Sequence, residues 1–191
     1  MQELIYIHGF NSSSQSQKAR ETAAWLSQHH PAIRLHAPTL PNDLAAALIL
    51  LEKTVKNCDH APGLIGSSMG GFFATILSQR YELPAVLINP AVHPHRLLKH
   101  YLGWNQNPHT GVRYELKEEH IELLRTMEVS VITHPELLWV LVKEGDETLD
   151  YRLAVEWYAG CQLEVAAGGN HAFEDFATRL PEIYAFLQAR I

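Results

Sequence analysis

Hydrophobic and polar residues form two alternating patterns along the chain. The first is a short, nearly continuous apolar run bounded by glycine, proline or asparagine, which is typical of strands buried on both faces of a sheet. Runs of this kind predict six strands, at residues 3–9, 32–38, 63–67, 84–92, 136–145 and 161–169.

The second pattern is longer, with apolar residues three to four positions apart, as in helices that cover a sheet. Asn42 or Asp43 can cap the second of these segments, because their side chains accept hydrogen bonds from free helix N–H groups. Pro181 is expected to disturb the last helix or divide it in two. The pattern predicts helices at residues 14–30, 41–58, 69–82, 149–160 and 172–191.

Regular alternation of strand and helix predicts an α/β fold, a three-layer α/β/α sandwich around a mainly parallel, six-stranded sheet. A chain of 191 residues suits one domain spanning residues 1–191. Residues 93–134 break the alternation, with helices expected at residues 96–104 and 117–127. We interpret this segment as a helical cap inserted over the site.

Composition narrows the class of protein. The chain is 47% hydrophobic and 19% charged, with a net charge of −6, which is ordinary for a globular protein and argues against general nucleic-acid binding. Its apolar runs are too short for a membrane span, and its N-terminus lacks the basic region of a signal peptide. Cys58 and Cys161 have neither metal nor redox spacing. These features favour a cytoplasmic location.

The sequence GLIGSSMGG, residues 63–71, lies between an expected strand and an expected helix. It contains the pattern G-x-S-x-G, centred on Ser68, which is typical of a sharp turn that exposes a nucleophilic serine. Close passage of the chain leaves no room for side chains at positions 66 and 70. The alternative is a serine-rich or phosphate-binding turn, but no G-K-[ST] follows. Ser67 lacks the flanking glycines, so we interpret it as structural.

A serine hydroxyl needs a base, and His171 is the candidate. It follows the strand CQLEVAAGG and precedes a helix, so it is expected at the same sheet edge as Ser68. Asp146 directly follows the strand LLWVLVK and can orient the imidazole. Glu147 and Asp150 are alternatives, although Asp150 is better placed to begin the next helix.

Two backbone N–H groups are candidates for an oxyanion hole. That of Met69 opens the helix after Ser68, and that of Phe10 follows His8-Gly9 at the end of the first strand. We expect His8 to brace this loop rather than act as a base. The polar residues after Phe10, namely Asn11 and Ser12 to Ser14, either bind substrate or cap the next helix.

Residues 93–102, HPHRLLKHYL, form a basic amphipathic stretch. Arg96 and Lys99 either hold an anionic leaving group or belong to a solvated helix face. The two histidines of H-P-H, His93 and His95, have no matching carboxylate or cysteine cluster in the sequence, so no metal site is expected.

These motifs resemble the α/β-hydrolase superfamily over nearly the whole chain. HGF after the first strand, GSSMGG at the turn, GDE after a late strand and GGNHAF near the end match in order and context. The chain looks similar to small bacterial esterases of the YqiA type, which lack the first strands of larger hydrolases. The resemblance implies Ser68 as nucleophile, His171 as base and Asp146 as acid, with Phe10 and Met69 as the oxyanion-hole residues.

The resemblance further implies hydrolysis of a small-molecule carboxylic ester or thioester without metal or cofactor, and without a nucleic-acid or membrane partner. An acyltransferase or a C–C hydrolase would use the same triad. A non-catalytic binding protein on the same scaffold is the alternative from a different class.

Overall fold

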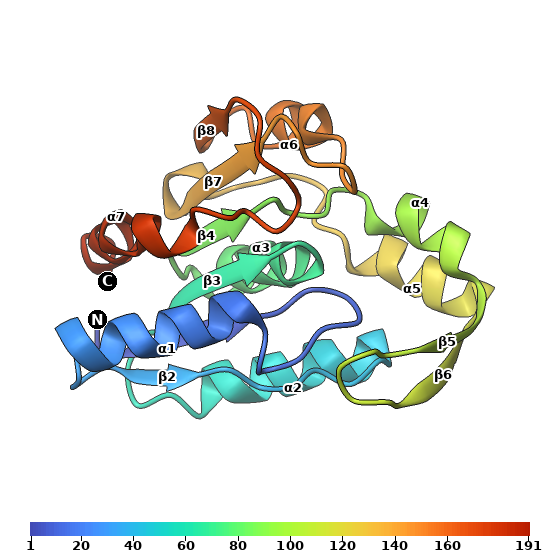
Figure 1. The fold of residues 1–191 in the computed structure, drawn as a ribbon, viewed down its shortest axis with the longest axis horizontal. Helices are drawn as coiled ribbons and strands as arrows, with labels where there is room; N and C mark the ends of the chain where they lie inside the picture. Colours follow the sequence, from blue (N-terminus) through green and yellow to red (C-terminus); the bar gives the residue numbers. More distant parts are fainter.

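The computed structural model describes all 191 residues. Six strands form one sheet in the order β2-β1-β3-β4-β7-β8 (Figure 1), and every neighbouring pair is parallel. The expected parallel sheet is confirmed, with strands at β1 (Glu3–Ile7), β2 (Arg34–His36), β3 (Gly63–Ser67), β4 (Ala85–Ile88), β7 (Leu138–Lys143) and β8 (Gln162–Ala166).

Five helices cover the sheet, and their starts carry side-chain caps where the sequence offers them. Asp43 accepts a hydrogen bond from the Ala46 N–H at 2.8 Å, and Ser16 caps the first helix. The first helix is therefore capped by Ser16 and not by any of the residues Ser12 to Ser14. The helices are α1 (Gln17–His29), α2 (Leu44–Lys56), α3 (Met69–Tyr81), α6 (Tyr151–Trp157) and α7 (Phe176–Gln188).

Alternate residues of each strand face different helix layers, because successive side chains of a strand point to opposite faces. In β1, Leu4 and Tyr6 are buried with α1 and α7, whereas Ile5 and Ile7 are buried with α2, α3 and α6. Two separate apolar cores therefore lie on either side of the sheet. This arrangement is the expected three-layer sandwich.

Pro181 lies inside α7, and the helix runs through it without a break. A proline removes one backbone donor, while the buried side chains Leu180, Ile183 and Leu187 hold this helix against the sheet. The expected division of the last helix is therefore wrong, because tertiary packing outweighs one lost hydrogen bond.

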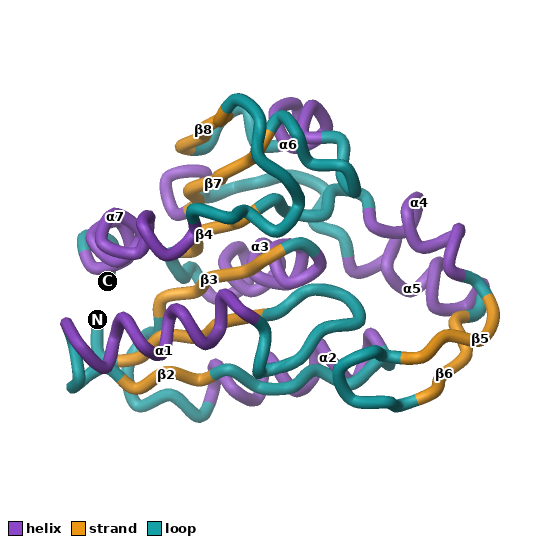
Figure 2. The backbone as a smooth tube through the Cα atoms, viewed as in Figure 1, coloured by secondary structure: helices purple, strands orange, loops and turns teal.

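The segment between β4 and β7 is only partly helical (Figure 2). Two strands, β5 (Gly103–Gln106) and β6 (Arg113–Leu116), form an antiparallel hairpin that was not expected; β5 begins within the last two residues of the helix expected at 96–104. The reason is local: Gly103 has φ of 98°, and the Asn107 side chain accepts hydrogen bonds from the N–H groups of His109 and Thr110 in the turn. The remaining elements are α4 (Pro94–Leu98), η1 (Lys99–Tyr101), α5 (Glu118–Met127) and η2 (Pro135–Leu137).

No helix is both long enough and apolar enough to cross a lipid bilayer.

Candidate active site

Ser68 occupies the turn between β3 and α3, with φ of 56° and ψ of −120°. Such a conformation is strained for any residue with a side chain, so the surrounding backbone must hold it. The Ser68 N–H donates to the Ile88 carbonyl at 3.0 Å, and its carbonyl accepts from Gly71 at 2.8 Å and Ala91 at 3.0 Å. The end of β4 and the start of α3 together fix this turn.

The glycines on either side of Ser68 are required by close backbone contacts. A Cβ atom on Gly66 would lie 2.3 Å from the Gly70 carbonyl oxygen, and one on Gly70 would lie 2.0 Å from the Ile7 carbonyl oxygen. Both separations are far below van der Waals contact. The spacing G-x-S-x-G therefore has the steric cause that the sequence analysis assigned to it.

The structure brings Ser68, His171 and Asp146 together from three different strand ends. His171 Nε2 lies 3.1 Å from Ser68 Oγ, and His171 Nδ1 lies 2.8 Å from Asp146 Oδ2. Because a carboxylate only accepts hydrogen bonds, Nδ1 carries the proton and Nε2 is free to accept from the serine hydroxyl. The Asp146 side chain is only 2% exposed, so this contact is shielded from water.

Asp146 is the one acid of the three candidates that meets the imidazole. Its second oxygen accepts hydrogen bonds from the N–H groups of Thr148 and Leu149, both at 2.8 Å. Glu147 instead accepts from the backbone N–H of His171 at 3.0 Å. Asp150 caps α6 and pairs with Arg152 at 2.7 Å.

Asn89, which the sequence analysis missed, holds the loop that carries His171. This buried residue follows β4 and has φ of 40°. Its Nδ2 donates to the carbonyls of Asn170 at 3.1 Å and His171 at 3.3 Å, and its Oδ1 accepts from the Lys143 N–H at 2.9 Å. The only sequence signal is an asparagine-proline pair directly after an apolar strand.

The two expected oxyanion donors both lie beside Ser68. A Cβ atom on Gly9 would lie 3.2 Å from Ser68 Cβ, so the chain entering Phe10 passes next to the serine. The Phe10 N–H donates to no acceptor within the protein. Met69 supplies the first N–H of α3, which has no partner inside the helix.

His8 braces the same loop and is not available as a base. Its Nε2 accepts a hydrogen bond from the Leu40 N–H at 2.9 Å, so its Nδ1 carries the proton and donates to the Gly9 carbonyl at 2.8 Å. Burial lowers the pKa of His8 below its ordinary value. The ring is therefore neutral, with both nitrogens occupied.

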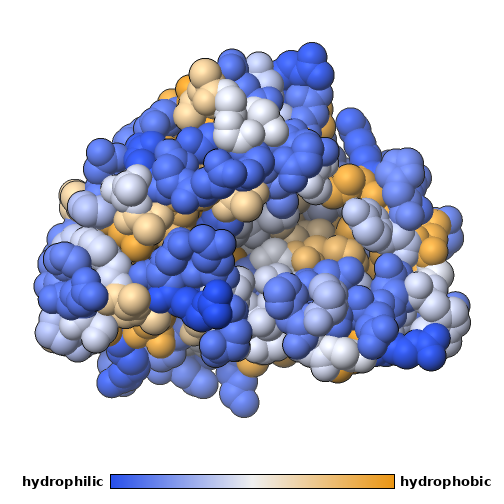
Figure 3. Space-filling view, viewed as in Figure 1, coloured by the Kyte–Doolittle hydropathy of each residue, from blue (hydrophilic) through white to orange (hydrophobic).

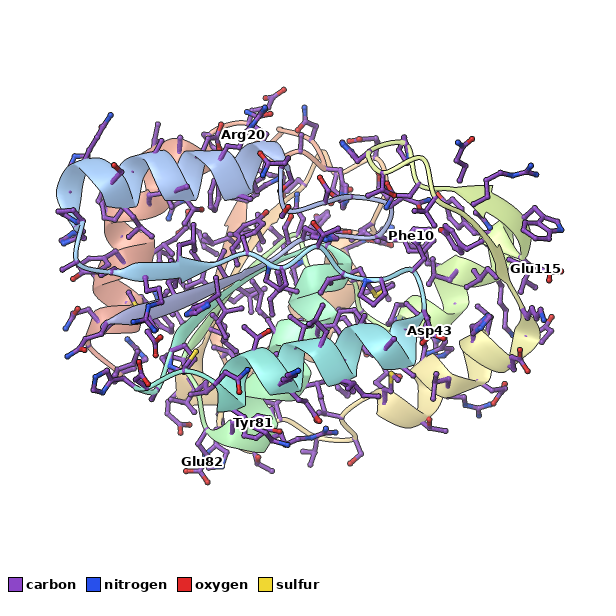
Figure 4. All side chains as sticks on the ribbon, turned by 90° about the horizontal axis from the view of Figure 1, so that it is seen from below. Phe10, Arg20, Asp43, Tyr81, Glu82 and Glu115 are labelled. Carbon is purple, nitrogen blue, oxygen red and sulfur yellow. The ribbon has the colours of Figure 1, made fainter.

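The inserted hairpin is fastened to the loop that carries Phe10. The Tyr114 hydroxyl donates to Asn11 Oδ1 at 2.6 Å, and Asn107 Nδ2 donates to the Ser12 carbonyl at 3.1 Å. The Phe10 ring packs edge-on against Tyr101 and Tyr114. Figure 4 shows Phe10 at the end of the sheet that faces the inserted segment, which carries the labelled Glu115.

A small apolar cavity of about 20 Å³ opens beside the two donor residues. Figure 3 shows a hollow with apolar surface in this region, between the sheet and the inserted segment. The hydrophobic side chains that line the cavity are those of Phe10, Leu40, Leu44, Ala47, Met69 and Phe73.

Arg96 and Lys99 lie outside the group formed by Ser68, His171 and Asp146. They line an open basin of about 430 Å³ between α4 and α5, and no residue of the Ser68–His171–Asp146 group lines it. The structure therefore does not bring these two cations together with the serine.

Comparison with known proteins agrees with this fold. A family model described as Uncharacterised protein family (UPF0227) matches residues 3–188. A UPF0227 protein of Shewanella oneidensis is 24% identical over 192 residues, which cover 96% of this chain and 98% of that protein.

Two solved structures extend the comparison beyond this family. Mouse alpha/beta hydrolase domain-containing protein 10 has a TM-score of 0.76 at 14% identity, covering 98% of this chain and 90% of its own. The monoacylglycerol lipase of Paleococcus ferrophilus has a TM-score of 0.71 at 12% identity, covering 97% and 94%. The chain therefore belongs to the UPF0227 family and has the fold of the α/β hydrolases, as its resemblance to the YqiA-type proteins predicts.

Proposed function

We propose that this protein is a serine hydrolase that cleaves carboxylic esters or thioesters through an acyl-enzyme on Ser68. The observation that carries the proposal is the position of one imidazole. His171 lies within hydrogen-bond distance of both Ser68 Oγ, at 3.1 Å, and Asp146 Oδ2, at 2.8 Å. Nucleophile, base and orienting acid need this order of contacts.

In the first half of the reaction, His171 Nε2 takes the hydroxyl proton as Ser68 Oγ bonds to the acyl carbon. The carbonyl electron pair moves to the oxygen, and the N–H groups of Phe10 and Met69 stabilise the resulting oxyanion. Losing one such donor costs about 3 kcal/mol in the transition state of comparable sites. The tetrahedral species then expels the alcohol or thiol, which receives its proton from His171.

In the second half, His171 takes a proton from water as the water oxygen bonds to the acyl carbon. The second tetrahedral species expels Ser68 Oγ, which recovers the proton, and the free acid departs. Asp146 stabilises the imidazolium in both halves. Every step uses side chains and backbone groups of this chain, so we expect no metal or cofactor in the reaction.

The substrate in this proposal is a small acyl ester or acyl thioester. The name of the Paleococcus lipase denotes an ester substrate, which supports an ester for this chain. We further propose that residues 93–134 act as the cap of a single domain. Both cysteines are free, which supports a reducing, cytoplasmic location.

The test is hydrolysis of p-nitrophenyl esters of increasing acyl length, with acyl-CoA in parallel, by wild type and Ser68→Ala. A fluorophosphonate probe reports whether Ser68 is nucleophilic. We expect turnover and labelling in wild type, and loss of both in Ser68→Ala. The neighbouring variant Ser67→Ala is the matched control and should keep both.

Other outcomes separate the alternatives. Equal hydrolysis by wild type and Ser68→Ala would contradict the proposal. Labelling of Ser68 without hydrolysis would favour an acyltransferase or a C–C hydrolase on the same residues. Absence of both labelling and turnover would favour a binding protein.

A further inference from the structure

Two histidines and a carboxylate meet between α4 and α5, away from Ser68. His93 precedes α4 with φ of 51°, and His95 lies in its first turn. Glu128 ends α5, 35 residues after His93, and α4 packs against α5. The sequence offered no carboxylate partner for H-P-H. The fold supplies one.

The three side chains present one potential ligand atom each to the same point. His93 Nδ1 lies 2.5 Å from Glu128 Oε1, and His95 Nδ1 lies 3.5 Å from Glu128 Oε2. The three ligand atoms lie within 4.8 Å of one another. Ligands at the usual zinc distances of about 2.0–2.2 Å in a tetrahedron are separated by roughly 3.3 Å, so small rotamer shifts suffice to bind one ion.

His93 forms a hydrogen bond with Glu128, whereas His95 lies near the same carboxylate without forming one. The Nδ1 atom of His95 is buried and has no hydrogen-bond partner, and a buried polar atom without a partner is destabilising. An unprotonated imidazole nitrogen is the form that binds a metal ion.

We propose that His93, His95 and Glu128 form a binding site for a divalent transition-metal ion of the Zn²⁺ class. The ligand set of two imidazoles and one carboxylate suits this class. The adjoining basin of about 430 Å³ gives access and leaves the fourth position to water or a small anion.

Some of the surrounding charges weaken the binding of a metal ion at this site and others strengthen it. Arg96, Lys99 and Arg125 line the basin and repel a cation, whereas Glu122 and Glu128 attract it. The C-terminal end of α5 adds partial negative charge beside Glu128. A bound ion joins the start of α4 to the end of α5, so its effect is to stabilise the inserted segment. This role is independent of Ser68 chemistry.

The experiment is a calorimetric titration of the chelator-treated full chain with Zn²⁺. We expect one saturable equivalent in wild type, and binding weakened by about tenfold or more in both His95→Gln and Glu128→Gln, because each variant removes a ligand. At a Zn²⁺ concentration that saturates wild type, the Tm of wild type should rise by roughly 5–10 °C, and the Tm of both variants should rise by clearly less. Two variants are used so that the test remains valid if one of them does not fold.

Two controls decide whether the binding belongs to this cluster. His109→Gln removes an exposed histidine of the same inserted segment and should bind as wild type does. Cys58→Ser removes a ligand from the second cluster, Glu3–His36–Cys58, and should also leave binding unchanged. Equal Zn²⁺ binding by wild type and Glu128→Gln, loss of binding in Cys58→Ser, or no saturable binding by wild type would each overturn the proposal.

Discussion

At the scale of single residues, the orientation of His171 depends on one carboxylate. Asp146→Asn replaces an acceptor by an amide that does not enforce the Nδ1–H tautomer, so we expect kcat for ester hydrolysis to fall by roughly 10³- to 10⁴-fold with the fold intact. Steady-state kinetics and circular dichroism check this result. The matched control is Asp150→Asn, four residues away, which alters only a helix cap and an exposed pair with Arg152. A comparable loss in both variants would contradict the assignment.

His8 makes a prediction about pH and stability. Its pKa is lowered in the folded state because burial and the Leu40 N–H favour the neutral ring. The unfolded chain therefore binds the proton more readily. The contribution of His8 is present above an unfolded pKa of about 6.5 and is lost as pH falls below it. We expect the free energy of unfolding to decrease between pH 7 and pH 5.

Urea denaturation at both pH values measures this change. His8→Gln keeps a neutral acceptor and donor in place, so its stability should change less over the same interval. Replacement of the exposed His100 by Gln should leave the pH dependence as in wild type. An identical pH dependence in wild type and His8→Gln would show that His8 does not titrate with folding.

At the scale of elements, the hairpin β5–β6 positions the loop that carries Phe10. Tyr114→Phe removes the hydrogen bond to Asn11, worth about 1 kcal/mol. We expect kcat to fall several-fold, up to about tenfold, with a smaller change in KM. Tyr101→Phe is the control, since its ring packs on Phe10 but its hydroxyl has no hydrogen-bond partner. A raised KM with unchanged kcat would instead assign Tyr114 to substrate binding.

The strand–turn–helix unit around Ser68 makes a second prediction at this scale. Gly70→Ala places a Cβ 2.0 Å from the Ile7 carbonyl oxygen, so β1 and α3 must separate. We expect destabilisation by several kcal/mol, on the order of 3 or more, in chemical denaturation. Gly160→Ala meets no atom closer than 3.8 Å and should stay within about 0.5 kcal/mol of wild type.

At the scale of the whole molecule, the space beside Ser68 limits the acyl group. The cavity beside Phe10 and Met69, of about 20 Å³, has room for roughly one water molecule, so we expect kcat/KM to fall as the acyl chain is lengthened from acetyl. Leu44→Ala widens the cavity and should shift the preference to longer chains. Leu48→Ala, on the same helix but outside the lining, should not. Preference of wild type for long chains would place the acyl group elsewhere in the hollow.

Hydrophobic periodicity predicted most of the fold, because it reflects which face of each strand or helix is buried. The apolar strands indicated a parallel sheet, and all six expected strands are present, five of them shorter than expected and β3 with the expected bounds. The hairpin was missed because Gly103 and Asn107 act through φ and turn hydrogen bonds, which hydrophobic periodicity does not show. The continuity of α7 through Pro181 was missed because burial decided it.

The sequence by itself determined where the chain turns sharply around Ser68 and which layers surround the sheet. Backbone sterics and the periodicity of buried residues act within a few positions, so both are visible in the order of residues. Only the tertiary structure decided that Asp146 rather than Glu147 or Asp150 meets His171. It alone brought Asn89 to the His171 loop and Glu128 to H-P-H. These contacts join residues 25 to 82 positions apart, and such distances in sequence are closed only by the packing of the whole chain.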